Sequence, residues 1–211
     1  MADTTKPAPG LAARKQATAL TLRRHALELV GQHGYAATST DDIARAAGVS
    51  PRTFFNYFPT KESAVLLPDG LLNDLVVDAI GRRPESEDPA ATMAAAAMDT
   101  FRVLGLLAQQ DDALLLLGIR VMLTEPALRG VVLERRGVAE EVAWQKLQER
   151  GVSPQDLGAR TAVATVITLC YLALDLWIST DGAEPLTAVL ARCLLVTPDP
   201  ARLAAGVTAT G

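Results

Sequence analysis

Two helix starts separated by a glycine stop lie within one short segment, TSTDDIARAAGVSPRTFFNYFPTKE, which spans residues 38–62. Ser39 precedes a threonine and two aspartates, so a hydroxyl is placed to cap free backbone amides and carboxylates favour the positive end of the helix dipole. Gly48 suits the left-handed position that ends a helix, and Ser50-Pro51 is typical of an N-cap followed by proline at the first helical position. The segment therefore predicts a helix, a tight turn and a second helix, the layout of a DNA-reading helix-turn-helix.

The second predicted helix, residues 51–57, carries more aromatic and polar side chains than a core contact needs. A repeat of 3.6 residues places Phe54 and Phe58 on one side, which is enough for the core. The remaining side chains suit base edges in the major groove: Arg52, Phe55 and Asn56. Others suit phosphate oxygens, which position a protein without specifying sequence: Thr53, Tyr57 and Lys61. The alternative is that Phe55 and Tyr57 are further core residues.

A longer pattern covers residues 18–66 and includes Leu22, Gly34-Tyr35, Ile43-Ala44, Ala47-Gly48-Val49-Ser50 and the run from Phe54 to Glu62. In this pattern the chain resembles the TetR family of bacterial repressors, and beyond residue 66 it is similar to that family only in architecture. The resemblance implies an all-α fold, with an N-terminal three-helix DNA-binding head and a C-terminal helical domain that binds small ligands and dimerises.

The resemblance also implies phosphate or base contacts by residues of the head. The complete set of candidate DNA-contacting residues is Ser39, Thr40, Arg52, Thr53, Phe55, Asn56, Tyr57 and Lys61. Asn56 departs from the family pattern, because relatives often carry a larger or basic residue there. The base preference at that position is therefore open.

Charge is distributed unevenly along the chain. The net charge is −4, but residues 1–66 contain eight Lys and Arg against five Asp and Glu, so the basic excess is local to this segment. Such an excess fits a DNA-binding part within an acidic protein. We predict a mobile N-terminal arm over residues 1–13, a DNA-binding domain over 14–66, and a ligand-binding and dimerisation domain over 67–211. Arg14 and Lys15 either reach DNA phosphate or form only a solvated helix start.

Residue types that build catalytic and metal sites are scarce. Of the two histidines, His25 lies in the first predicted helix, roughly residues 13–32, and His33 lies at its end, while Cys170 and Cys193 lie in apolar stretches. A His-based catalytic triad, a multi-histidine metal site and a disulfide are therefore not expected, and the chain has no glycine-rich phosphate loop. We expect no cofactor, no metal and no enzymatic activity. The N-terminus lacks the regions of a signal peptide, so we expect a cytoplasmic protein.

Breaks in the apolar pattern define the remaining helices. A helix that starts at Thr60 and runs toward Ile80 is interrupted by Leu67-Pro68-Asp69-Gly70, which predicts either a kink or two separate helices. A polar connector over residues 81–88 follows it. Further helices are predicted at about 89–109, 111–124, 126–150, 154–179 and 184–196.

Residues 161–180 are almost wholly apolar and long enough to suggest a membrane span. Asp175, several threonines and the absence of a basic C-terminal flank argue against one. A helix that is apolar on all sides also fits a position between a core and a partner subunit. We therefore predict that this helix and the 184–196 helix form a four-helix dimer interface across a two-fold axis, with no membrane partner.

Polar residues within the apolar C-terminal helices predict a small-molecule pocket. The candidate ligand-binding residues are Met98, Phe101, Arg102, Arg120, Trp144, Thr168, Tyr171 and Asp175. The alternative is that the Arg and Asp residues pair with each other or face solvent, and that the rest is plain core.

The function predicted from these patterns is that of a homodimeric repressor that binds a palindromic DNA operator and is released by a small hydrophobic effector. One alternative is a helical ligand-binding protein or enzyme with a vestigial DNA-binding head. Another, a sequence-tolerant DNA-coating protein, is disfavoured because the net charge of −4 attracts phosphate poorly.

Overall fold

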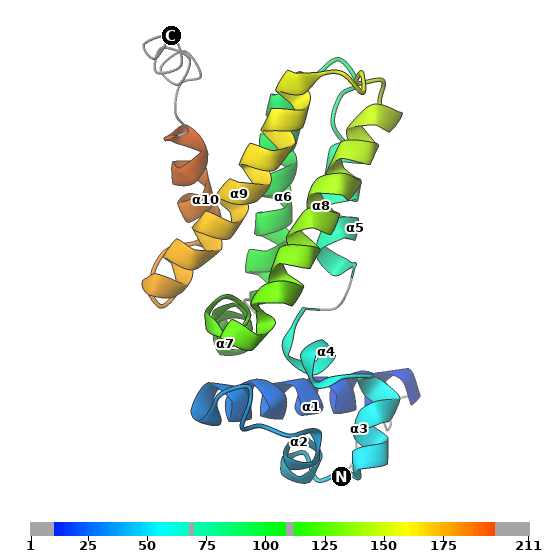
Figure 1. Ribbon diagram of the computed structural model, residues 1–211, viewed down its shortest axis with the longest axis vertical. Helices are drawn as coiled ribbons and strands as arrows, with labels where there is room; N and C mark the ends of the chain where they lie inside the picture. The colour runs from blue at the N-terminus through cyan, green and yellow to red at the C-terminus, as the bar shows by residue number, and fades with distance from the viewer. Residues whose placement is uncertain (1–10, 68–69, 109–111, 197–211) are drawn as a thin grey trace, which may run out of the picture. The chain divides into compact units, whose positions relative to one another are not determined.

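The computed structural model describes residues 11–67, 70–108 and 112–196, and these form ten α-helices and one 3-10 helix with no strand among them (Figure 1). The predicted all-α fold is therefore confirmed. The described residues divide into two compact units: those within 1–69 and 113–130 form the first, and those within 70–112 and 131–211 form the second. Most of the predicted mobile arm, residues 1–13, lies outside the described residues, whereas residues 11–13 begin the first helix.

The first unit is built on one long helix, α1, against which the short helices α2 and α4 pack (Figure 1). Its α-helices are α1 (Leu11–His33), α2 (Thr40–Ala46), α3 (Pro51–Tyr57), α4 (Lys61–Val65) and α7 (Asp112–Thr124). The core is apolar and fully enclosed, because Leu22, Leu27, Ile43 and Phe54 have no exposed surface. This burial, and not helix propensity, holds helices of five to seven residues in place.

The caps and stops of this unit form where the sequence predicts them. The Ser39 hydroxyl accepts a hydrogen bond from the Asp42 amide at the start of α2, and the Ser50 hydroxyl accepts one from the Thr53 amide at the start of α3. Pro51 occupies the first position of α3, and Gly48 has φ 68° in the turn between the two helices. The predicted helix-turn-helix is confirmed.

The helix α7 packs on α1 and belongs to the first unit, although the sequence assigns everything after residue 66 to a C-terminal domain. Gly31 on α1 faces Leu117, and Gly118 faces Leu27. Each helix thus presents a bare glycine to a leucine side chain of the other. Sequence patterns within α7 carry no sign of this pairing.

The interruption after α4 separates two helices. The helix α4 ends at Val65, and α5 (Leu71–Gly81) begins after Gly70, which has φ 83°. Pro68 and Asp69, the residues that predict the break, lie outside the described residues. Of the two alternatives left by the sequence, a kink or two helices, the structure has two helices.

The second unit is a helical bundle in which α6 packs against α5, α9 and α10, and α9 packs against α10. Its helices are α5, α6 (Pro89–Ala108), α8 (Arg129–Glu149), α9 (Leu157–Ser179) and α10 (Leu186–Leu195). A 3-10 turn, η1 (Pro126–Leu128), comes directly before α8 in the sequence and belongs to the first unit. Each helix of the second unit lies within a few residues of a predicted helix. Within the described part of the chain, α9 is the one helix long and apolar enough to cross a membrane by length and composition. It buries eight residues within the bundle.

Candidate nucleic-acid interface

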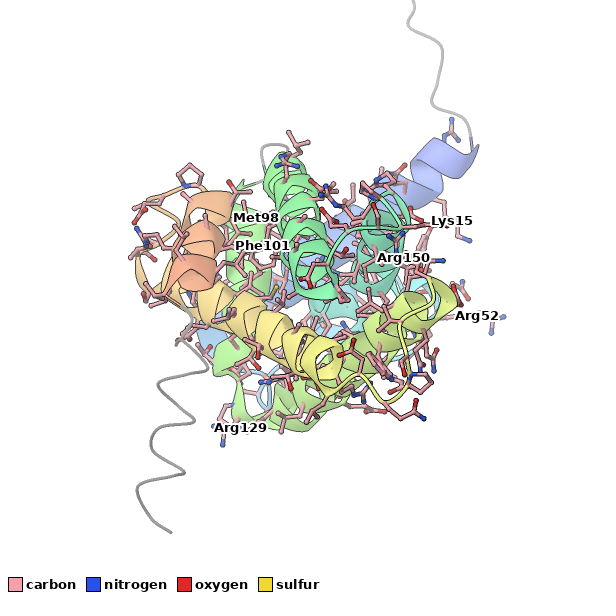
Figure 2. The ribbon with its side chains drawn as sticks, turned by 90° about the horizontal axis from the view of Figure 1, so that it is seen from above. Lys15, Arg52, Met98, Phe101, Arg129 and Arg150 are labelled. Carbon is pink, nitrogen blue, oxygen red and sulfur yellow. The ribbon has the colours of Figure 1, made fainter. Side chains whose placement is uncertain are left out.

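The outer face of α3 carries the three side chains predicted to read bases. Arg52 and Asn56 are exposed, the Arg52 side chain extends into solvent (Figure 2), and the Phe55 ring is 52% exposed. The fully buried Phe54 ring lies edge-on to Phe55, with ring centroids 5.4 Å apart. The core therefore fixes the direction in which α3 presents this face.

Two of the hydroxyls predicted to contact DNA are engaged in helix caps. Ser39 Oγ lies 2.5 Å from Asp42 Oδ2 and 3.1 Å from the Asp42 amide, and its hydrogen bond is the main cause that lowers the pKa of Asp42. Ser50 Oγ and Thr53 Oγ1 are 2.8 Å apart. Ser39 and Thr53 thus shape the starts of α2 and α3, and their contact with phosphate stays a prediction, as does that of Thr40 and Tyr57.

Lys61 is held by the loop between α1 and α2. Its ammonium donates hydrogen bonds to the carbonyl oxygens of Tyr35 at 2.6 Å and Thr38 at 2.7 Å, and lies 3.9 Å from the centroid of the Tyr35 ring. The sequence predicts a phosphate contact here. The structure shows a positioning role as well, since Lys61 joins the first turn of α4 to residues 35–38.

A second tie between the same segments was not predicted from the sequence. The Tyr35 hydroxyl donates a hydrogen bond to the Glu62 carboxylate. Burial, together with that carboxylate, raises the pKa of Tyr35, and the hydrogen bond from Tyr35 lowers the pKa of Glu62. Tyr35 and Glu62 both belong to the sequence pattern of the head, but they are far apart in the sequence, so only the structure shows that they are in contact.

An open groove of about 680 Å³ lies on the first unit between the end of α1 and the outer side of α2. It is lined by Leu29, His33, Ala37, Thr38, Asp42, Arg45 and Ala46. None of the residues predicted to bind DNA or a ligand lines it. The predicted arm residues Arg14 and Lys15 are exposed in the first turns of α1.

The candidate ligand-binding residues fall into two groups. Phe101 and Trp144 are buried in the second unit, at 4% and 7% exposed, and Met98 lies one turn from Phe101 on α6 (Figure 2). Tyr171 is partly buried, which raises the pKa of its hydroxyl, and the Arg136 guanidinium lies 5.8 Å from its ring centroid. These four residues have the apolar character that a ligand cavity needs.

The other four candidates lie at the surface. Arg102 pairs with Asp99 on the solvent side of α6, and Asp175 is exposed. Arg136 donates a hydrogen bond of 2.6 Å to the exposed Thr168 hydroxyl, and Arg120 is an exposed residue of the first unit. A charge at the surface keeps its hydration, which burial without a partner would remove at high cost. The structure therefore does not bring all eight candidates to one cavity.

The cysteines are both free thiols of the second unit, and burial raises the pKa of Cys170 to about 12, which makes its thiolate scarce at neutral pH. In residues 11–67, 70–108 and 112–196, no group of three or more His, Cys, Asp or Glu side chains is placed to hold a metal ion.

Apolar side chains remain exposed on the two helices predicted to form a dimer interface. Leu172 and Leu176 on α9 are 43% and 41% exposed, and Leu195 and Val196 at the end of α10 are more exposed still. Leu172 and Leu176 are four residues apart and therefore share one side of α9. A second protein surface would remove this side from water.

Comparison with known proteins matches residues 22–65 to the sequence profile of the family described as bacterial regulatory proteins, tetR family. The HTH-type transcriptional regulator TcmR of Streptomyces glaucescens is 36% identical over 138 residues, which cover 62% of this chain and 59% of TcmR. The match thus spans less than two thirds of the length of that relative.

Solved structures extend the likeness over most of the chain. SmeT, the repressor of the Stenotrophomonas maltophilia multidrug efflux pump SmeDEF, has a TM-score of 0.55 at 16% identity and covers 85% of this chain and 88% of its own. The fatty acid degradation regulator FadR of Bacillus halodurans has a TM-score of 0.53 at 22% identity and covers 90% of this chain and 94% of its own. At these identities the two structures show a shared fold.

Proposed function

Because the chain belongs to the TetR family of bacterial regulatory proteins, we propose that it is a sequence-specific transcription repressor that binds a palindromic DNA operator as a homodimer and acts in the cytoplasm. The observation that carries the proposal is the exposed face of α3. Arg52, Phe55 and Asn56 stand together on a helix whose opposite side is anchored by the fully buried Phe54.

The chemistry of this face matches the major groove. An arginine fork fits the two acceptors of guanine, an asparagine amide fits adenine, and an aromatic ring fits the methyl group of thymine. Within the described part of the chain, the Arg52 and Asn56 side chains make no hydrogen bond or ion pair. Their donors and acceptors are therefore available to a duplex. Base contacts by these residues would supply the specificity, whereas phosphate contacts by Thr40 and Tyr57 would supply the register. Lys61, bonded to the carbonyls of Tyr35 and Thr38, would position the start of α4.

The exposed side of α9, with Leu172 and Leu176, supports dimerisation through α9 and α10. A two-fold axis pairs the same surface of both subunits, so one apolar side is enough for a closed dimer. Two heads separated by about 34 Å meet successive major grooves on one face of the duplex and require a palindromic site.

The apolar second unit supports an effector function. Met98, Phe101, Trp144 and Tyr171 offer apolar and aromatic surface to a small hydrophobic molecule, which would bind at the expense of the operator. Coupling between two such sites is typically about 1–3 kcal/mol and is reciprocal, so operator DNA must weaken effector binding by the same factor.

The proposal is tested by selecting bound duplexes from a randomised library at about 0.15 M salt, which suppresses nonspecific phosphate binding. A palindromic motif supports the proposal. The folded protein must also lose that motif when Phe55 is replaced by alanine. If the folded wild-type protein selects no motif, a ligand-binding protein with a vestigial DNA-binding head becomes the better account.

A further inference from the structure

The end of α4 is closed by a side chain of α1. The Arg23 guanidinium donates hydrogen bonds to the carbonyl oxygens of Leu66 and, at 3.3 Å, Val65. The last carbonyls of a helix have no partner within the helix, and a cation there also opposes the negative end of the helix dipole. Arg23 thus serves as the C-terminal cap of α4, from 42 residues away in the sequence.

This cap matters because α4 has only five residues and is separated from α5. A single helical turn is not stable in isolation. At its start, Lys61 is bonded to the carbonyls of Tyr35 and Thr38. At its end, Arg23 holds the last carbonyls. Both ends of α4 are therefore held by hydrogen bonds, the start to the loop after α1 and the end to α1 itself. These bonds set the position of Lys61, a candidate DNA contact.

The same guanidinium lies against α7. A Cβ atom built on Gly118 would stand 3.9 Å from Arg23 Nη2, the nitrogen that bonds the Val65 carbonyl, and 3.6 Å from a methyl carbon of Leu27. Two turns further along α1, a Cβ on Gly31 would stand 3.1 Å from a methyl carbon of Leu117. Arg23, a residue of α1, therefore contacts two other helices: its guanidinium donates to the carbonyls at the end of α4 and lies next to Gly118 of α7.

We propose that Arg23 is a positioning residue through which the location of α7 on α1 sets the geometry of α4 and hence the affinity for the operator. The inference rests on the proposed function for its DNA readout. Along the chain, α7 follows α6 and precedes α8, both in the second unit. Within the first unit, a shift of α7 along α1 moves Arg23 against the α4 carbonyls.

The test introduces a branched side chain where α7 meets Arg23 and measures whether the resulting loss of operator affinity depends on Arg23. Gly118→Val puts two methyl groups where Arg23 and Leu27 lie, and we expect operator affinity to fall about tenfold. The matched control is Gly137→Val in α8, where a Cβ meets no atom within 4 Å. We expect this control to bind the selected operator as wild type does. Circular dichroism and thermal unfolding establish that each variant is folded.

The decisive comparison is the double variant with Arg23→Met, which keeps the aliphatic stem and removes the donors. If Gly118 acts through Arg23, Gly118→Val should cost less than about twofold in the Arg23→Met background, because contacting residues couple and independent ones add. The same tenfold loss in both backgrounds overturns the inference. Arg23→Lys, which keeps the charge and restores one donor, should recover part of the affinity lost in Arg23→Met.

A second measurement needs no DNA. Hydrogen exchange at the Leu66 amide, bonded to the Glu62 carbonyl at the end of α4, should be faster in Gly118→Val than in Gly137→Val. Equal protection in the two variants contradicts the proposal. Should the wild-type protein select no operator, the proposed function fails, while the exchange result still decides whether Gly118 and Arg23 control α4.

Discussion

Replacing Lys61 with methionine separates two roles that the structure and the sequence give to one side chain. The sequence predicts a phosphate contact, which would weaken binding to all DNA alike and leave the fold intact. In the structure the ammonium donates to two carbonyls, those of Tyr35 and Thr38, and lies over the Tyr35 ring. Methionine has similar length and apolar volume, so Lys61→Met removes the donors and little else.

The expected loss of stability follows from these contacts. A hydrogen bond to a charged group contributes about 1.5–3 kcal/mol, and an exposed cation–π contact about 0.5–1 kcal/mol. Lys61 is only partly buried, so water replaces part of what is lost. We therefore expect the head to lose about 2–3 kcal/mol, well under the sum of the separate contributions. A contact with phosphate alone would leave this quantity unchanged.

The assay must report on the first unit. Both tryptophans, Trp144 and Trp177, lie in the second unit, so tryptophan fluorescence does not follow the head. Hydrogen exchange in peptides that cover residues 35–66 follows it directly. The control is Arg52→Met, an exposed change expected to alter stability by no more than about 0.5 kcal/mol. Hydrogen exchange in Lys61→Met that equals that of wild type, together with a decrease of about one in the slope of log affinity against log salt concentration, would show that the ammonium binds phosphate. That result would contradict the positioning role.

Three further predictions concern DNA, dimerisation and pH. Arg52→Ala should cost about 1–3 kcal/mol on the selected operator and relax its sequence preference in competition assays; equal loss on random duplexes contradicts base reading. Leu172→Asp should convert a dimer to a monomer in sedimentation velocity, and an unchanged dimer excludes this side of α9 from the interface. The Arg83 guanidinium holds the pKa of Glu87 at about 2, below its ordinary 4.5, so the carboxylate stabilises the fold above pH 4.5 and this contribution is lost as pH falls toward 2. Urea midpoints of Glu87→Gln and wild type should differ at pH 7 and converge as the pH falls to about 2; a constant difference would show that the charge is unimportant.

The head was predictable because its signals are local. The N-caps at Ser39 and Ser50 and the positive φ of Gly48 depend on residues three or four positions away. Helical periodicity places Phe54 and Phe55 on different sides of α3, and the structure buries Phe54 and exposes Phe55. Breaks at proline and glycine similarly placed every helix of the second unit to within a few residues.

Contacts between distant segments were not predictable. Lys61 reaches a carbonyl 26 residues away, and Arg23 reaches one 43 residues away. The position of α7 on α1 depends on Gly31 and Gly118, which in the sequence look like ordinary helical glycines. The ligand candidates failed to converge for a related reason. Arg102, a polar residue in an apolar helix, pairs with Asp99 on the preceding turn, at the surface of the helix.

Hydrogen bonding within the head distinguishes the residues predicted to read DNA from those expected to position them. A side chain whose donors already serve carbonyls or carboxylates within the head, as in Lys61 and Ser39, must give up those bonds before it can bind a duplex. Arg52 and Asn56 have no such bonds among the described residues, so their full hydrogen-bonding capacity is gained on binding. Sequence preference should therefore follow substitutions on the outer face of α3, whereas substitutions at Lys61 should change affinity through the placement of α4.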